Sequence, residues 1–259
     1  MGFTSRAENT SPITALKMVI SDVGAVYRLS VRTIYYLFNG KREKGAIAAQ
    51  MYAIGNQSMF FMAVTMAFIG AIITFQTGLQ SQKLVPDMSM VGATFTKLLI
   101  RDLAASVGAL PLATRVGAGI AAEIGSMVVT EQVDAMRMCA ADPIDYLVVP
   151  RFVASVIMSG VVLIIGGFIA FGAGMLVANV MFDVNPHTFA NLSMVNSGDV
   201  IMGVTKAFTY GGAIALVRAQ RGLATFGGSE GVGWATTEAV AGRCSATFWR
   251  NLRRSIFGD

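Results

Sequence analysis

The chain has 259 residues, of which 54% are hydrophobic and only 14% are charged. Because soluble domains carry about 25% charged residues on average, this composition excludes an ordinary soluble domain and indicates an integral membrane protein. The formal net charge of +5 fits basic residues that are kept on the cytoplasmic side of a membrane, so we expect no nucleic acid as a partner.

Few side chains could support metal, redox or nucleophilic chemistry. Cys139 and Cys244 lie far apart in the sequence, and His187 is the single histidine. This spacing suits neither a metal site nor a disulfide framework. The sequence also contains no Walker A motif and no nucleophile beside a base. We therefore expect no enzyme activity, no cofactor and no metal.

The N-terminal residues predict a helix in the membrane interface. Between residues 16 and 38, apolar side chains recur every three or four positions, and basic residues such as Arg28 and Arg32 fall mainly between them. This basic amphipathic pattern is typical of a helix that lies on a membrane, although a helix packed on a partner protein would show it too. The basic cluster at residues 41–44 then predicts a cytoplasmic N-terminus.

Four apolar segments are long enough to cross a bilayer, which takes about 20 residues. We expect these spans within residues 45–82, at 90–114, at 152–181 and at 200–217. The predicted fold is therefore all-α and membrane-embedded. It has an N-terminal interfacial helix, four transmembrane helices and a short cytoplasmic helix between the second and third spans.

Charged residues interrupt two of these segments. Lys97, Arg101 and Asp102 lie in the second, and Lys206 lies in the fourth. Charges inside a membrane normally face a cavity or pair with one another. One hypothesis is that the three basic residues, with only Asp102 to balance them, share an outward-facing cavity that accepts an anionic lipid head group. The alternative is a set of internal ion pairs that only holds the helices together.

A strongly polar stretch, residues 123–151, separates the second span from the third. Helix formers fill most of it, and Asp142-Pro143 can start a new helix, since Asp caps a helix and Pro suits its first turn. We therefore expect a short helix outside the membrane. Its acidic residues Glu131 and Asp134 are three positions apart, so they would share a helix face and contact a soluble partner.

Two classes of function fit these features. The first is a transport subunit driven by a separate ATPase, which needs a docking helix between two spans. The second is a secondary transporter or channel that uses the charges at Lys97, Arg101, Asp102 and Lys206. A secondary transporter needs no such docking helix, so residues 123–151 favour the first class.

The same polar stretch carries a family resemblance. Residues 123–136, EIGSMVVTEQVDAM, and residues 142–151, DPIDYLVVPR, resemble the signature of the MlaE/YrbE family. The members of that family are the permease subunits of ABC-type lipid transporters. Residues 115–123 and 227–240 are similar to the family too, and the likeness covers residues 45–240.

The resemblance implies a bacterial inner-membrane permease, homodimeric or paired with a related subunit, that moves a lipid such as a phospholipid. It also implies cytoplasmic ATP-binding subunits and an MCE-domain lipid-binding protein on the outer side. By position, the resemblance assigns ATPase coupling to Glu123, Gly125, Glu131, Asp134 and Ala135. It assigns the wall of the lipid cavity to Arg101-Asp102, where the family usually has Arg-Glu.

The chain departs from this family at two places. Ala104-Ala105 stands where the family usually has Gly-Pro, so the helix kink that Gly-Pro would produce is not predicted here. Residues 241–259 replace the family's fifth span, and three arginines in them would cost roughly 8–10 kcal/mol to insert. We expect a basic helix on the cytoplasmic membrane surface instead, and hence four spans with both termini cytoplasmic. The chain is predicted to be one permease domain, 1–259, made of an N-terminal part (1–44), a family-like core (45–240) and an atypical tail (241–259).

Overall fold

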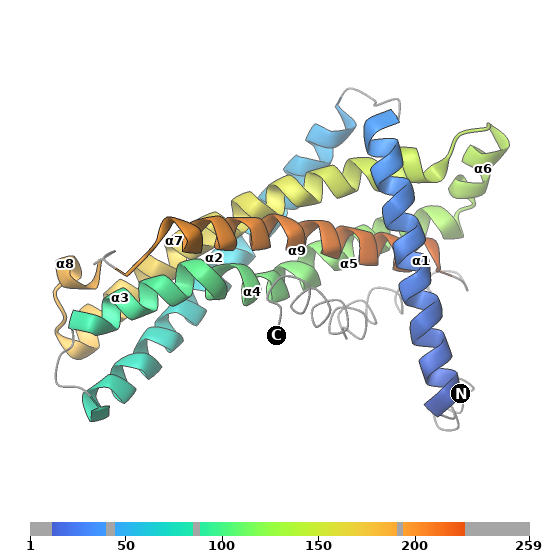
Figure 1. The fold of residues 1–259 in the computed structure, drawn as a ribbon. Coiled ribbons are helices and arrows are strands. Elements are labelled where there is room, and N and C mark those ends of the chain that lie inside the picture. Colours follow the sequence, from blue (N-terminus) through green and yellow to red (C-terminus); the bar gives the residue numbers. More distant parts are fainter. Residues whose placement is uncertain (1–11, 40–44, 85–88, 191–193, 226–259) are drawn as a thin grey trace, which may run out of the picture. The chain divides into compact units, whose positions relative to one another are not determined.

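The computed structural model describes residues 12–39, 45–84, 89–190 and 194–225, which form helices joined by turns (Figure 1). No strand occurs in these four ranges, and the all-α fold is confirmed. The elements are α1 (Pro12–Asn39), α2 (Ala46–Leu84), α3 (Ser89–Leu98), η1 (Leu99–Leu103), α4 (Ala104–Ser106), α5 (Ala109–Val129), α6 (Gln132–Met138), η2 (Ile144–Val148), α7 (Val149–Phe182), α8 (Pro186–Phe189) and α9 (Ser197–Leu223). The two η elements are π-helical turns.

Four helical stretches of the described chain are long and apolar enough to cross a membrane. They are Ala46–Ser81, Gly92–Val129, Ile144–Phe182 and Ser197–Leu223. Their number matches the prediction, but three of them are longer than expected. The fourth has 27 residues rather than the predicted 200–217, because α9 runs from Ser197 to Leu223. The second and third have 38 and 39 residues, because α5 continues to Val129 and η2 precedes α7, so the polar break begins at Thr130 rather than at Glu123.

Two predictions fall outside the described residues. The basic cluster at 41–44 is one of them. The other is the basic C-terminal helix at 241–259, and with it the replacement of a fifth span. Both stay predictions.

Contacts divide the chain into two compact units. The first comprises Met1–Arg42, Gly119–Val149 and Leu216–Asp259, and the second comprises Glu43–Ala118 and Pro150–Ala215. Helices α1 and α6 and the turn η2 belong to the first unit, and α2, α3, η1, α4 and α8 belong to the second. Helices α5, α7 and α9 contribute residues to both. The single permease domain over the whole chain stays a prediction.

Small residues let helices of the second unit approach closely. Gly70 on α2 faces the backbone of Ala170 on α7 so tightly that a Cβ at this position would overlap it. In the same way, Gly203 on α9 faces the carbonyl oxygen of Ile100 on η1. Glycine permits such approaches between membrane helices. The contacts of α2 with α7 and of α9 with η1 therefore require a residue without a side chain at these two positions.

The second span is not a regular helix. At η1 the N–H of Ala104 donates to the carbonyl oxygen of Leu99, five residues back, which is the π-type pattern. Residues 107–108 then form a turn before α5 begins. The helix is therefore irregular beside Ala104-Ala105, although alanine is the best helix former.

In the first unit, α1 packs against η2. Leu29 and Thr33 lie on the buried side of α1, at 4% and 0% exposure. Other large apolar residues of α1 are exposed, namely Val23, Tyr27, Val31, Ile34, Tyr35 and Phe38. A helix with exposed apolar and basic residues suits a membrane surface. The exposed apolar residues of α1 therefore agree with the predicted interfacial helix.

Candidate functional site

Four charged side chains from η1 and α9 come together in the second unit. Arg101 Nη1 donates to Asp199 Oδ1 over 3.3 Å, and Arg101 Nε lies 3.9 Å from Asp102 Oδ2. Lys206 Nζ donates to Asp102 Oδ1 and, over 3.3 Å, to the carbonyl oxygen of Arg101. We call Arg101, Asp102, Asp199 and Lys206 the ion-pair cluster.

Burial differs within the ion-pair cluster. The side chains of Lys206 and Asp199 are 6% and 9% exposed, whereas those of Arg101 and Asp102 are 41% and 46% exposed. The two positive charges balance the two negative ones, so an anion is not needed to offset an excess of one sign. This arrangement fits the alternative of internal ion pairs, and it leaves the Arg101 guanidinium accessible.

The expectation that only Asp102 balances the basic residues is wrong, because Asp199 is a second acidic partner. Helix α9 begins at Ser197, so Asp199 lies in its first turn rather than in the preceding loop. There Asp199 Oδ2 also accepts the N–H of Asn196 over 3.2 Å. Acidic residues are favoured in the first turn of a helix, and this was the sequence signal that could have identified Asp199.

Lys97 forms no ion pair with the cluster in the part of the chain that the structure describes. It is half-buried in the last turn of α3. Its spacing of four from Arg101 would place both residues on one face of a regular α-helix. However, η1 begins between them, and its π geometry changes that register. The structure thus brings Arg101, Asp102 and Lys206 together, while the place of Lys97 beside them stays a prediction.

The residues predicted to couple an ATPase lie on α5 and around α6, in the first unit. Glu131 precedes α6 with a left-handed backbone, φ 58°, so it does not share a regular helical turn with Asp134. Asp134 Oδ1 accepts from Arg137 Nη1 over 2.9 Å, but the two side chains are 69% and 64% exposed. A pair this exposed contributes little free energy, so Asp134 can exchange its partner. Of the five predicted residues, Gly125 is buried and Glu123, Glu131, Asp134 and Ala135 are exposed.

Helix α6 has sharply defined ends. Glu131 before it and Ala140 after it both have left-handed backbones, with φ of 58° and 57°. This conformation costs a non-glycine residue about 1–2 kcal/mol, so packing has to hold it in place. Val133, which is 3% exposed, supplies an apolar anchor for α6. The result is a short, anchored helix with an exposed acidic surface.

Asp142 starts the next helix and ties it to α1. Its Oδ1 accepts the N–H of Ile144 over 3.0 Å, and its Oδ2 accepts the Tyr36 hydroxyl over 2.7 Å. The helix start predicted at Asp142-Pro143 is thereby confirmed. The hydrogen bond to the Asp142 carboxylate raises the pKa of Tyr36 above its ordinary value of 10.0, because deprotonation would break the bond and place two negative charges together. Tyr36 lies 106 positions from Asp142, so no local pattern points to it.

The described residues contain four apolar helices of membrane-crossing length, with a short polar helix between the second and the third, and these define a multi-pass membrane protein. Comparison with known proteins specifies its kind. The family described as Permease MlaE matches residues 47–254, and the chain belongs to this family. The match continues past residue 240 into the segment predicted to depart from the family.

Similar proteins carry a more detailed name. The probable ABC transporter permease protein slr1045 of Synechocystis sp. is 33% identical over 230 residues, covering 88% of this chain and 87% of its own. A probable ABC transporter permease protein of Rickettsia bellii is 37% identical over 197 residues, covering 75% of each chain. The ycf63 protein of Porphyra purpurea, named in the same way, is 29% identical over 227 residues, covering 87% and 86%.

Proposed function

We propose that this permease is the membrane subunit of an ABC transporter, that a separate ATPase drives it, and that it carries a lipid, in the first instance a phospholipid. The family match and the names of the relatives support the ABC class. The remaining parts of the proposal follow from the resemblance to lipid-transporting permeases. They are a homodimer, an MCE-domain protein on the outer side, and an inner-membrane location with a cytoplasmic N-terminus.

The observation that carries the coupling role is the position and chemistry of α6. This helix joins the end of α5 to the start of η2 and α7, so it is continuous in the chain with two membrane spans. Because Val133 anchors α6 and its two ends are well defined, a displacement of α6 by a bound ATPase would move the connected membrane helices. Glu131 and Asp134 supply exposed negative charge that a basic surface of an ATPase subunit could bind.

The accessible Arg101 guanidinium, rather than the charge-balanced ion-pair cluster as a whole, supports a lipid head group as the polar end of the cargo. Arg101 is the accessible cation of the cluster, and its present partners are Asp199 and Asp102. An arginine can bind a phosphate with two parallel hydrogen bonds, so a phospholipid head could replace one carboxylate partner. Lys206 would then keep Asp102 in place from the buried side.

A secondary transporter or channel is the second candidate function. The observation that favours it is the burial of Lys206 and Asp199 within a membrane span, since such groups often mark ion or proton pathways. The two candidates differ in their energy source. An ABC permease stops when ATP hydrolysis stops, whereas a secondary transporter stops when its ion gradient is dissipated.

Reconstitution of the intact complex tests the proposal directly. The complex is purified through a tag on this chain, its bound lipids are measured by mass spectrometry, and transfer of a fluorescent phospholipid from its vesicles is followed with and without ATP. We expect a co-purified ATPase, bound phospholipid and ATP-dependent transfer. Transfer that does not depend on ATP but stops when the ion gradient is dissipated would support a secondary transporter instead.

A further inference from the structure

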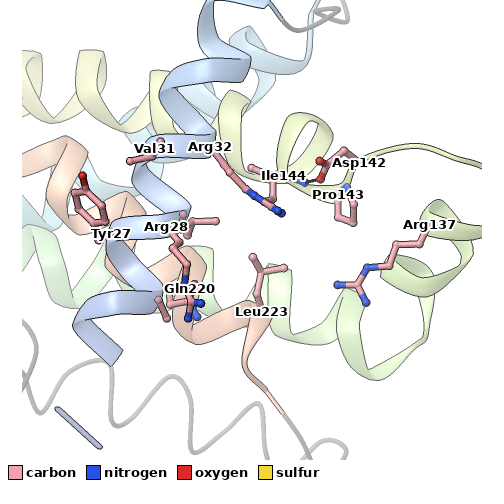
Figure 2. A pocket seen from close by; sticks show the side chains of 12 residues that line it. Tyr27, Arg28, Val31, Arg32, Arg137, Asp142, Pro143, Ile144, Gln220 and Leu223 are labelled. Atoms are coloured by element: carbon pink, nitrogen blue, oxygen red, sulfur yellow. Dashed lines mark hydrogen bonds between the residues drawn. The ribbon is translucent and has the colours of Figure 1, made fainter. Parts of the chain in front are cut away.

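A pocket of about 640 Å³ lies within the first unit, where α1, α6, the residues before η2 and the end of α9 meet (Figure 2). Pockets that hold small ligands typically measure about 300–1,000 Å³, so this one has the size of a binding site. Three arginines line it: Arg28 and Arg32 from α1 and Arg137 from α6. In Figure 2 the side chains of Arg32 and Arg137 point into the pocket from opposite sides.

The charge of this pocket is not balanced by the described residues that line it. Asp142 is the one carboxylate among them, and both of its oxygens are already engaged by the Tyr36 hydroxyl and the Ile144 N–H. Among the residues that the structure describes, Arg137 pairs only with the exposed Asp134. Arg28 and Arg32 form no ion pair within the described part of the chain. An anion in the pocket would therefore meet three guanidinium groups against the single carboxylate charge of Asp142.

The surroundings of the pocket are amphipathic. Val31, Ile144 and Leu223 are apolar side chains that line it beside the arginines. The exposed apolar residues of α1, which include Tyr27 and Phe38, suit a helix at the depth of lipid head groups. Basic residues at that depth attract anionic lipids of the cytoplasmic leaflet.

We infer that the pocket binds the phosphodiester of an anionic membrane lipid, with Arg28, Arg32 and Arg137 as the groups that hold it. The geometry of arginine suits two hydrogen bonds to one phosphate, and the apolar lining suits the glycerol and the first methylenes of the acyl chains. This site lies in the first unit and the ion-pair cluster lies in the second. The inference therefore does not depend on the proposed cargo or on coupling to an ATPase.

Native mass spectrometry of the full-length protein in a neutral detergent tests the inference. The protein is titrated with phosphatidylglycerol, with zwitterionic phosphatidylcholine and with inorganic phosphate. The test variant is Arg28→Gln with Arg32→Gln, and a second variant with lysine at both positions keeps the charge. The matched control is Arg115→Gln, an exposed arginine of α5 that does not line the pocket. All of these side chains are exposed, so the variants are expected to keep the fold.

We expect the wild type to retain phosphatidylglycerol in preference to phosphatidylcholine. The double glutamine variant should bind phosphatidylglycerol about tenfold more weakly, the double lysine variant should be intermediate, and the Arg115 control should match the wild type. Equal retention of phosphatidylglycerol by all variants would overturn the inference. It would also be overturned if inorganic phosphate, and not the lipid, showed the dependence on Arg28 and Arg32, because the site would then serve a soluble anion.

Discussion

Tyr36 and Asp142 lie 106 positions apart in the chain, and the Tyr36 hydroxyl donates a 2.7 Å hydrogen bond to Asp142 Oδ2. The same carboxylate accepts the N–H of Ile144 at the start of the helix that leads into α7. One side chain thus caps a membrane helix and holds the N-terminal helix beside it. The position of α1 is therefore linked to the polar segment that carries α6.

This relationship predicts a dependence on alkaline pH. The folded-state pKa of Tyr36 is raised above 10.0, so the bond contributes fully below about pH 10 and is lost as the pH rises through the folded pKa. Comparison of the wild type with Tyr36→Phe by ultraviolet titration should show one phenol that titrates above pH 10. The difference in Tm between the two proteins should be constant below pH 10 and should shrink above it. The proposed effect of the Tyr36–Asp142 hydrogen bond would be contradicted if the Tyr36 phenol titrated with a midpoint at or below pH 10.0. It would also be contradicted if the difference in Tm did not change with pH.

Charge reversal at α6 should separate the ATPase from the permease. We expect Glu131→Lys with Asp134→Lys to lower the amount of co-purified ATPase by about tenfold or more, since like charges would then face each other. Insertion in the membrane should be normal, which membrane fractionation measures. Asp183→Lys is the control, because Asp183 is also acidic and exposed and has a similar backbone, φ 56° against 58° for Glu131. Normal co-purification in the double variant would mean that the acidic surface is only solvated.

Removal of Asp102 should lower the stability of the protein more than removal of Asp102 and Lys206 together. Asp102→Asn removes the carboxylate from Lys206, whose side chain is only 6% exposed. We expect a loss of about 1–3 kcal/mol in the free energy of unfolding, less than for a fully buried pair because Asp102 is nearly half exposed. Adding Lys206→Met should recover part of this loss, which thermal unfolding in detergent can measure as a double-mutant cycle. Additive effects would show that the two residues are not coupled.

Arg101 should matter for bound lipid more than for assembly. We expect Arg101→Ala to lower the phospholipid that co-purifies with the complex severalfold while the subunits remain together. Arg115→Ala serves as the control, since Arg115 is exposed on α5 and takes no part in the ion-pair cluster. Lipid mass spectrometry of both variants gives the result. Unchanged lipid in Arg101→Ala would leave the cluster with a purely structural role.

The C-terminus provides a test of topology. If the four spans of the described residues are the only crossings, both termini lie on the same side of the membrane. The arginines at 250, 253 and 254 oppose a fifth crossing. A reporter that works only in the cytoplasm should therefore be active when fused after Asp259. A reporter that works only outside should be inactive at the same position. The reverse pattern would mean that residues 241–259 complete a crossing.

Local features of this protein could be predicted from sequence because each depends on neighbouring residues. The four spans follow from runs of apolar residues that are long enough to cross a bilayer. The short helix α6 follows from polar helix formers between two such runs. The helix start after Asp142 follows from an Asp-Pro pair, since a cap needs only its own next few residues. The lengths of the second and third spans were less predictable, because Glu123 and Asp145 do not stop a helix by themselves.

Only the tertiary structure decided which distant groups meet. Asp199 joins Arg101 across 98 positions, and Tyr36 joins Asp142 across 106. The spacing of four between Lys97 and Arg101 predicts one shared face only for a regular helix, and the π turn at η1 changes that register. The pocket with its three arginines draws on residues from α1, α6 and α9. These long-range contacts depend on how the helices pack. Composition and local spacing do not show which helices are neighbours in the folded protein.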